Sequence, residues 1–329
     1  MSDFAIEAVG LVKRYGAKRA LDGVGFEVPR GTVCGLLGPN GAGKTTAVRI
    51  LTTLTAADAG TARVAGIDVA ADPRAARRAL GLAAQEATVD ALLTGRENLT
   101  MIGELHHLGR RVARARADQL LEQFSLTDAG GRLAKTYSGG MRRRLDLAAT
   151  LVARPEVLFL DEPTTGLDPR ARNELWDVLD RLVDEGATIL LTTQYLEEAD
   201  RLADDIVVID HGRVIARGDA HALKAQVGGA QLFAAVADPA RLGELAEAVE
   251  RITGTAPEVD ASARSVHAAT DGGPRAVSQL ADAMADAGVE LDDVGLRRPT
   301  LDEVFLTLTG APIDEDAGER PAAREGARA

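Results

Sequence analysis

A glycine-rich stretch, GPNGAGKTT, combines the residue types that bind phosphate, and its spacing matches the pattern G-x-x-x-x-G-K-[ST]. Glycines let successive backbone N–H groups turn toward phosphate oxygens, and a helix N-terminus adds partial positive charge. A lysine supplies a compact point charge, and a threonine hydroxyl suits Mg²⁺. We therefore predict a phosphate loop that consists of Gly38, Pro39, Asn40, Gly41, Ala42, Gly43, Lys44, Thr45 and Thr46.

Two acidic residues follow an apolar run in the sequence VLFLDEP. Open α/β sheets gather ligand-binding groups at the carboxyl ends of their strands. We therefore expect Asp161 to join a Mg²⁺ shell and Glu162 to orient and deprotonate an attacking water. Taken alone, two acids before a proline turn are more simply a strand end, but the phosphate loop in the same chain favours the chemical interpretation.

The sequence YSGGM precedes an amphipathic stretch and offers a second candidate anion site. Ser138 has a small hydroxyl, and Gly139 and Gly140 leave the backbone accessible at a helix start. On its own the segment is more simply a capped helix start. Two phosphate-type sites in one chain favour the binding interpretation.

The segments that position these residues predict an α/β fold with a mainly parallel sheet. Four apolar runs have few interior charges, as strands buried on both faces should: they are residues 33–37, 157–160, 188–192 and 206–209. Near the N-terminus, alternating segments predict an antiparallel β subdomain with one solvated face. Residues 94–153 contain no convincing strand and predict a helical insertion, which opens with a capping-box pattern from Thr94 to Glu97.

The sequence changes character near residue 220, so we predict one domain that carries the phosphate loop over residues 1–220 and a linker over 221–230. Residues 231–310 then predict a small α+β domain of order βαββαβ, which is ferredoxin-like. Its elements are expected at 231–236, 238–251, 256–260, 264–269, 274–288 and 290–296. A last helix starts at Thr300 with a second capping box, and residues 311–329 predict a disordered tail.

Charge and composition limit the class of protein. The 329 residues carry a net charge of -12. Residues 1–220 hold 28 Lys and Arg against 31 Asp and Glu, and the remainder hold 10 against 19, so neither part has the basic excess of a nucleic-acid binder. One cysteine, Cys34, fits a reducing compartment. No apolar run reaches the roughly 18 residues that span a bilayer, so we expect a soluble, cytoplasmic chain.

The order of GPNGAGKTT, Gln85, YSGGM, VLFLDEP and GLDP resembles that of the ABC-type ATPases, the nucleotide-binding subunits of ABC transporters. In that family the segment at the YSGGM position binds the γ-phosphate of an ATP held by the partner subunit. The resemblance implies Mg²⁺-dependent ATP hydrolysis by two copies of this chain, which hold two ATP between them in a head-to-tail dimer. It also implies a separate integral membrane permease, and hence a peripheral location on the cytoplasmic face of the membrane.

Single residues acquire expected roles from the same resemblance. Tyr15 matches the aromatic residue that stacks on adenine, and Gln85 matches the glutamine that contacts Mg²⁺ and water. Asp168 matches the acid that crosses the dimer interface, and it is also a candidate helix N-cap before Pro169. Gln194 occupies the position where the family usually has histidine. Because glutamine donates a hydrogen bond without titrating, we expect ATP binding to persist and the rate and pH dependence of hydrolysis to change.

Two further segments, TGRENL and RRPTLDEVFLTLTG, resemble the daunorubicin-resistance branch of drug-exporting ABC ATPases. The resemblance covers roughly residues 4–310 and implies export of a drug-like or hydrophobic compound. The alternatives are a soluble ABC ATPase without transport and a nucleotide-gated assembly factor. The final helix either packs on its own domain or binds the second subunit.

Overall fold

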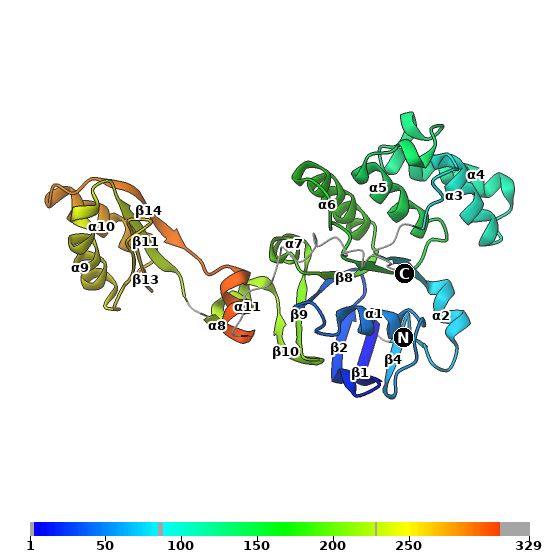
Figure 1. Ribbon diagram of the computed structural model, residues 1–329, viewed down its shortest axis with the longest axis horizontal. Helices are drawn as coiled ribbons and strands as arrows, with labels where there is room; N and C mark the ends of the chain where they lie inside the picture. The colour runs from blue at the N-terminus through cyan, green and yellow to red at the C-terminus, as the bar shows by residue number, and fades with distance from the viewer. Residues whose placement is uncertain (1–2, 85–87, 228, 310–329) are drawn as a thin grey trace, which may run out of the picture. The chain divides into compact units, whose positions relative to one another are not determined.

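The computed structural model describes residues 3–84, 88–227 and 229–309, which form two compact units that divide between Asp219 and Ala220 (Figure 1). Gln85 and the predicted tail at 311–329 lie outside the described residues. Among the described residues, no helix has both the length and the apolar character needed to cross a bilayer.

The first unit is built around a six-stranded sheet of order β10-β9-β3-β8-β7-β6. Its strands are β3 (Val33–Leu37), β6 (Leu80–Ala83), β7 (Val157–Asp161), β8 (Thr188–Thr193), β9 (Asp205–Asp210) and β10 (Arg213–Gly218). All neighbours pair in parallel except β10, which is antiparallel to β9. Every residue of β3, β7 and β8 is buried, as strands covered on both faces require. The predicted parallel sheet is thus confirmed, whereas β6 and β10 were not predicted.

A second, antiparallel sheet of order β2-β1-β4-β5 belongs to the same unit. It consists of β1 (Phe4–Tyr15), β2 (Lys18–Pro29), β4 (Ala59–Val64) and β5 (Ile67–Asp68), and Figure 1 shows β1, β2 and β4 beside one another. Buried and exposed residues interleave along β2, as expected for a sheet with one solvated face. The antiparallel β subdomain is therefore confirmed.

The helices of the first unit follow the strands or form the insertion. They are α1 (Lys44–Leu51), α2 (Pro73–Ala79), α3 (Gly95–Leu105), α4 (Arg110–Gln123), α5 (Gly139–Thr150), α6 (Pro169–Asp184) and α7 (Leu196–Leu202). The insertion begins where predicted: Thr94 accepts from the Glu97 backbone, and the Glu97 side chain accepts from the Thr94 backbone. Residues 88–153 contain only helices, 3-10 turns and loops, apart from one isolated bridge between Thr94 and Leu133.

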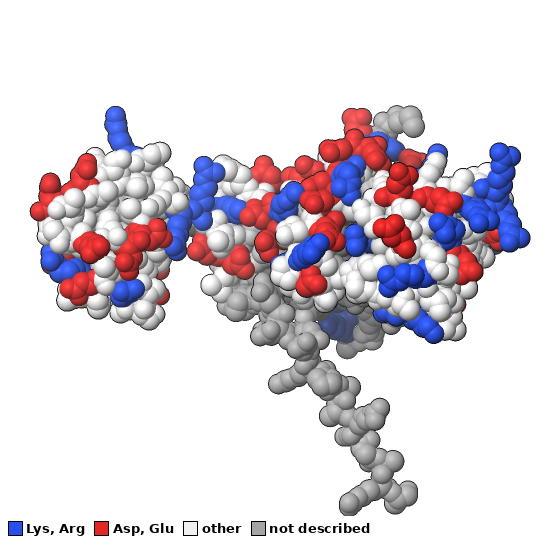
Figure 2. Space-filling model, turned by 90° about the horizontal axis from the view of Figure 1, so that it is seen from above, with Lys and Arg blue, Asp and Glu red and all other residues white. Residues whose placement is uncertain are grey.

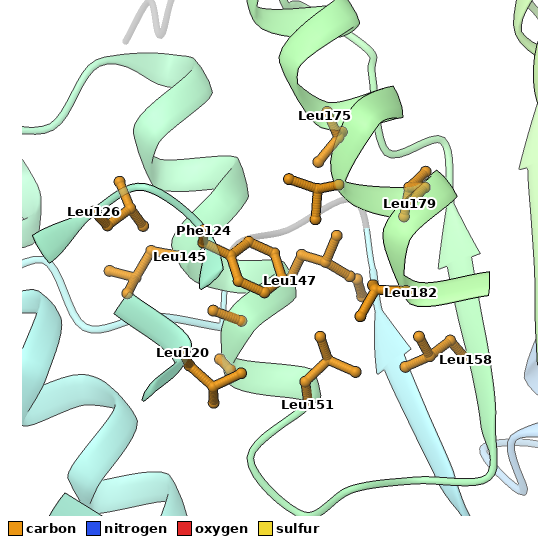
Figure 3. Packing of buried hydrophobic residues seen from close by; sticks show 14 of the residues in the cluster. Leu120, Phe124, Leu126, Leu145, Leu147, Leu151, Leu158, Leu175, Leu179 and Leu182 are labelled. Carbon is orange, nitrogen blue, oxygen red and sulfur yellow. The ribbon is translucent and has the colours of Figure 1, made fainter. Parts of the chain in front are cut away.

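A leucine-rich core joins the insertion to the parallel sheet (Figure 3). The residues labelled there come from α4, α5, α6 and β7 and the loops beside them: Leu120, Phe124, Leu126, Leu145, Leu147, Leu151, Leu158, Leu175, Leu179 and Leu182. Phe124 and Leu145 are completely buried. Because interiors are close-packed, this cluster fixes α5 against both the insertion and the sheet.

The second unit contains a four-stranded antiparallel sheet of order β12-β13-β11-β14. Its elements run β11 (Gln231–Val236), α9 (Leu242–Thr253), β12 (Glu258–Asp260), β13 (Ser265–Ala269), α10 (Pro274–Asp286) and β14 (Leu291–Arg297). Leu232, Leu245 and Leu280 belong to its own core, and Figure 1 shows α9 and α10 along one side of the sheet. The order βαββαβ and the sheet topology are compatible with the expected ferredoxin-like fold.

The segment predicted as a linker differs from expectation, because residues 220–227 form helix α8 (Ala220–Val227). This helix packs against α11 (Leu301–Thr309), and Leu223 and Phe305 are buried. The burial explains why an apparently polar stretch, HALKAQV, adopts a helix. Thr300 and Glu303 form the predicted second capping box. Of the two alternatives for the last helix, packing within its own unit is observed.

Candidate functional site

The carboxyl ends of four neighbouring strands bring the predicted chemistry together. The strands β3, β8, β7 and β6 are adjacent in this order. They end at the phosphate loop, at Gln194, at Asp161 with Glu162, and at Ala84, the residue before Gln85. This edge of a parallel sheet is where ligands bind in open α/β folds. Gln85 itself lies outside the described residues, so its expected contact with Mg²⁺ stays a prediction.

Two glycines of the phosphate loop lie in close contact with the backbone of neighbouring strands. Gly38 has a φ of 153°, and a Cβ atom there would lie 2.1 Å from the Ile209 carbonyl oxygen. Gly43 has a φ of 117°, and its Cβ would lie 2.6 Å from the Ala20 carbonyl oxygen. Only glycine fits such positions, because they combine a left-handed backbone with no space for a side chain. The loop is therefore held in shape by β9 and β2.

Lys44 lies folded onto the loop that precedes it. Its Nζ donates to the carbonyl oxygens of Gly38, at 2.6 Å, and Pro39, at 3.3 Å, and the residue is only 5% exposed. Burial lowers the pKa of Lys44, while the negative charges of Glu162 and Asp161 oppose that shift. The Lys44 ammonium group is therefore held close to the two acids. A phosphate that enters the loop would replace the two carbonyl oxygens as its hydrogen-bond acceptor.

The remaining residues of the phosphate loop differ in their exposure to solvent. Asn40 and Gly41 are exposed, Pro39 is half-buried, and Ala42 donates its N–H to the Pro39 carbonyl oxygen at 3.1 Å. In the first turn of α1, Thr45 is exposed and Thr46 is half-buried. The Thr45 hydroxyl is thus accessible at the helix N-terminus.

Asp161 and Glu162 adopt different conformations at the end of β7. Asp161 is 6% exposed, and its Oδ1 accepts a hydrogen bond from the Thr192 hydroxyl at 2.5 Å. Glu162 has a φ of 50°, which is uncommon for a residue with a side chain. Its N–H donates to the Thr192 carbonyl oxygen at 3.0 Å. Both acids are therefore positioned by one residue of β8.

Gln194 follows β8 and is 6% exposed. Its buried Oε1 has no hydrogen-bond partner among the residues that the structure describes. Because an unpaired buried polar atom costs roughly 1–3 kcal/mol, this orientation of the amide is best explained by a ligand group or water that completes the site. The two ends of an amide are interchangeable by rotation, so the side chain can accept or donate there.

These observations test whether the site fits a nucleotide with Mg²⁺. The glycine-lined loop has no room for side chains, and the Gln194 amide oxygen lacks a partner. The Thr45 hydroxyl and the Asp161 carboxylate are oxygen donors, which Mg²⁺ prefers. No cluster of three or more His, Cys, Asp or Glu side chains is present in the described ranges.

Tyr15 lies at the end of β1, opposite Lys18 in the β1–β2 pair. It is 47% exposed, and Lys13 Nζ lies 5.7 Å from the ring centroid. An exposed ring with one cation nearby suits stacking on a purine base.

The YSGGM segment forms an exposed helix start. Ser138 is the N-cap of α5, because its Oγ accepts from the Met141 N–H at 3.2 Å. Ser138 and Gly139 are exposed, and a Cβ at Gly139 would meet nothing within 4 Å. The adjacent Tyr137 is buried, and its hydroxyl donates to the Ala129 carbonyl oxygen at 2.7 Å. The N-terminus of α5 is thus exposed, while the buried Tyr137 side chain fixes the position of the residue that precedes it.

The GLDP segment lies beside this helix start. Asp168 is the N-cap of α6, with its Oδ1 accepting from the Ala171 N–H at 2.8 Å, which confirms the predicted cap. A Cβ at Gly140 would lie 2.8 Å from the Ala171 Cβ. Gly140 therefore allows close packing of α5 against α6, while the exposed Asp168 stays accessible.

Sequence reasoning missed Arg143, whose guanidinium contacts the backbone of the acidic pair. Its Nη2 lies 3.2 Å from the Glu162 carbonyl oxygen and 3.3 Å from that of Asp161. The available signal was the spacing of Arg143 and Asp146, which places opposite charges three residues apart on one helix face.

Comparison with known proteins agrees with this site. The family model described as "ABC transporter" matches residues 21–165. The chain is 56% identical over 310 residues to "Daunorubicin resistance ATP-binding protein DrrA2" of Streptomyces coeruleorubidus, covering 94% of this chain and 96% of the relative. It is 38% identical over 315 residues to "Nod factor export ATP-binding protein I" of Rhizobium sp. (strain N33), covering 96% of this chain and 100% of the relative.

Among solved structures, the chain is similar to one titled "Structure of ATP binding subunit of ABC transporter". The TM-score is 0.61 at 29% identity, over 68% of this chain and 92% of that one. Two relatives align over nearly their whole length, and the ATP-site segments lie together at one sheet edge. The chain therefore belongs to the ABC transporter family, as an ATP-binding subunit with an ABC ATPase domain.

Proposed function

We propose that this ATP-binding subunit powers the export of a hydrophobic, drug-like compound through a separate membrane permease. The observation that carries the proposal is the 56% identity to a protein named for daunorubicin resistance, over 94% of this chain. The more distant relative named for Nod factor export supports the direction of transport. A soluble ATPase without transport and a nucleotide-gated assembly factor are the alternatives that the experiments below separate.

We assign roles at the nucleotide from the chemistry of each side chain. Tyr15 stacks on the base, the phosphate loop holds the phosphates, and Lys44 neutralises the charge that develops on the γ-phosphate. Glu162 accepts a proton from the attacking water, and Gln194 hydrogen-bonds to the water or the γ-phosphate. Thr45, Gln85 and Asp161 would hold Mg²⁺, which neutralises negative charge on the phosphate oxygens when bound.

The two anion sites of one chain serve different ATP molecules in this proposal. Ser138, Gly139 and Gly140 of one copy face the γ-phosphate held at Lys44 of a second copy, in a head-to-tail dimer. The exposure of Ser138 and Gly139 supports this, because their N–H groups and hydroxyl are accessible from outside the chain. Asp168, which is exposed at the start of α6, lies at the same interface.

The insertion offers the surface on which we expect the permease to dock. A groove of about 700 Å³ lies along α3, lined by Leu93, Glu97 and Met101 among others. Leu105 and Val112 nearby in the chain are 70% and 57% exposed. Basic side chains gather at the α3–α4 end of the unit (Figure 2). The groove combines the apolar side chains of Leu93 and Met101 with acidic and basic groups, so it suits a short amphipathic segment of a membrane protein. Such docking would place the chain on the cytoplasmic face of the membrane.

The substitution Glu162→Gln tests the catalytic assignment. We expect turnover to fall by about 100-fold or more, since glutamine cannot accept the proton, while ATP affinity is retained. ATP should then trap a dimer, measured by size-exclusion chromatography with light scattering. Glu156→Gln, just before the opposite end of β7, is the matched control and should hydrolyse ATP normally. Normal turnover in the Glu162 variant would contradict the assignment.

Transport is tested by co-expression with a candidate permease, a membrane protein of about six transmembrane segments to be sought in the neighbouring reading frame. We expect cells carrying both proteins to expel daunorubicin, and the purified complex to hydrolyse ATP faster when the drug is added. A Lys44→Met subunit in the same complex should support neither activity. Drug-independent ATPase activity with no efflux would favour the soluble-ATPase alternative, and ATP binding without hydrolysis would favour the assembly factor.

We further propose that the second unit contributes to assembly. The unit has a buried core of its own, so its removal leaves the core of the first unit covered. Deletion of residues 220–329 should weaken dimer or permease association while ATP affinity stays unchanged. Unchanged association of the truncated chain, measured by co-purification, would refute the proposal.

A further inference from the structure

Arg143 links helix α5 to two separate loops at the sheet edge. Its Nη1 donates to the Ala84 carbonyl oxygen at 2.8 Å, just after β6. Its Nε donates to the Pro163 carbonyl oxygen at 2.7 Å, and Nη2 reaches Asp161 and Glu162 as described above. Burial lowers the pKa of the Arg143 guanidinium, with the Asp146 charge opposing that shift, but arginine keeps its proton in proteins. One charged group therefore binds the loop that carries the catalytic glutamate.

Asp146 extends this link from the next turn of α5. It is completely buried, and its Oδ2 lies 3.5 Å from Arg143 Nη1. Its Oδ1 accepts from the Thr88 N–H at 2.7 Å and also from the Thr88 hydroxyl. The two residues thus attach α5 to Ala84 and to Thr88, which flank residues 85–87 in the chain. Charge-assisted hydrogen bonds of this kind are about twice as strong as neutral ones.

The backbone that Arg143 contacts is strained. Glu162 has a φ of 50°, and such a conformation costs of the order of 1–3 kcal/mol for a residue with a side chain. Strain persists only where surrounding contacts determine the conformation. Here Thr192 holds the N–H of Glu162 and Arg143 holds its carbonyl oxygen. The orientation of the Glu162 side chain therefore depends on a group that α5 carries.

A cavity separates part of the start of α5 from this loop. It has a volume of about 360 Å³ and is lined by Gly139 and Arg142 on one side and by Glu162 and Thr165 on the other. Arg143 also lines this cavity and crosses from the helix to the loop. A shift of the helix start would thus reach Glu162 most directly through the Arg143 hydrogen bonds.

We propose that Arg143 is a positioning residue that transmits the position of α5 to Glu162 of the same chain. The inference rests on the proposed dimer, in which the start of α5 binds the phosphate of the partner's ATP. Closure of α5 on one nucleotide then orients the base that deprotonates the water attacking the other nucleotide. The two ATP sites of the dimer are thereby coupled through one chain, by the hydrogen bonds of Arg143 to the loop that carries Glu162.

The first experiment compares Arg143→Met with Arg142→Met in the full-length chain. Methionine removes the hydrogen bonds but keeps a long apolar stem, and Arg142 is the exposed neighbour with the same charge. We expect kcat of the Arg143 variant to fall by about 10-fold or more while ATP affinity stays within about 2-fold of wild type. Tm should fall as well, because the buried Asp146 loses its cationic neighbour. Arg142→Met should stay within about 2-fold. Equal kcat values for the two variants, or a parallel loss of ATP affinity, would overturn the inference.

The second experiment asks whether Arg143 acts through Glu162. In a Glu162→Gln background, Arg143→Met should cause no further loss of the residual single-turnover rate, because the group that it positions is already inactive. The ATP-trapped dimer should still form, since closure of α5 does not need the link. A further multiplicative loss of rate would overturn the inference.

Failure of the dimer proposal gives a different result. If Glu162→Gln alone traps no dimer, the dimer proposal fails. The comparison of kcat with ATP affinity for Arg143→Met then still decides whether the residue positions Glu162. Arg143→Lys serves as the conservative variant: it keeps the charge but reaches fewer carbonyls, and should restore part of kcat.

Discussion

The N-termini of α1 and α5 both present candidate anion sites, yet they are built in opposite ways. At α1 the loop is packed so tightly that a Cβ at Gly38 or Gly43 would collide with a backbone oxygen, and Lys44 is buried. At α5, Ser138 and Gly139 are exposed and a Cβ at Gly139 would meet nothing. The first site is preformed by its own chain. The second offers donors that its own chain leaves uncovered.

The difference shows how one chain can supply parts of two different ATP sites, with α1 at one site and α5 at the other. A preformed loop pays little reorganisation on binding, so it can hold a nucleotide before any partner arrives. An exposed helix start has few contacts of its own and gains specificity only when a second surface closes over it. We therefore expect substitutions at α1 to affect binding by a single chain, and those at α5 to affect turnover.

The largest expected contrast is between Lys44→Met and Ser138→Arg. Lys44→Met should weaken ATP binding by the isolated chain by about 100-fold or more, because the only buried cation of the described loop is lost. Ser138→Arg should leave that affinity within about 3-fold but reduce turnover by about 100-fold, because a large side chain blocks the partner's phosphate. Titration with a fluorescent ATP analogue and a phosphate-release assay measure the two quantities. Loss of binding by the isolated Ser138 variant would remove the distinction.

A second contrast concerns Gly43→Ala and Gly139→Ala. The methyl group at residue 43 would meet the Ala20 oxygen and a Leu21 methyl at under 3 Å, with φ at 117°. We expect a loss of about 3 kcal/mol in the free energy of unfolding, from strain and displacement. At residue 139 the methyl group meets nothing, so the loss should stay below about 0.5 kcal/mol. Urea denaturation of both variants measures the loss in the free energy of unfolding. Equal losses for the two variants would show that the α1 loop is not tightly packed.

The substitution Tyr137→Phe tests the buried hydrogen bond next to the exposed start of α5. The Tyr137 hydroxyl is buried and donates to the Ala129 carbonyl oxygen, so removing it should cost about 1 kcal/mol of unfolding free energy. Turnover should change by less than about 2-fold, because the N–H groups of α5 are retained. Thermal unfolding and phosphate release measure the two effects. A large loss of turnover with full stability would assign the tyrosine to the chemistry instead.

The smallest expected effect is a pH dependence at Glu198, which is completely buried and accepts from Trp176 Nε1 at 3.2 Å. Burial raises the pKa of the Glu198 carboxyl. Its folded form therefore keeps the proton to higher pH than the unfolded form, and the associated stability is lost as pH rises through the folded pKa. Glu198→Gln does not titrate, so its Tm relative to wild type should rise between pH 5 and pH 8. A constant difference across that range would contradict the assignment.

Local patterns predicted much of the site, because its chemistry sits in short contiguous segments. The phosphate loop and the Asp161–Glu162 pair each begin directly after an apolar run, and the alternation of apolar runs and helices placed those runs in one parallel sheet. The capping boxes at Thr94 and Thr300 were likewise visible, since their partners are three residues apart.

The features that were missed depend on long-range contacts. Strand β6 is only four residues long, and pairing with β7 defines it. Helix α8 was assigned to a linker because its polar sequence is helical only when Leu223 is buried and α11 packs against it. Arg143 looked like one of three consecutive arginines, and only the fold brings Ala84 and Glu162 to it.

Cys34 lies in β3, the strand that leads into the phosphate loop, and is the only cysteine of the chain. It is 1% exposed, and burial raises the pKa of its thiol to about 12. A thiol reagent at pH 8 can therefore react only when β3 opens. The labelling rate is a native reporter of how often this strand opens, without an introduced label. Bound nucleotide should slow the labelling in proportion to its occupancy, so one mass measurement would follow both ligand binding and local opening.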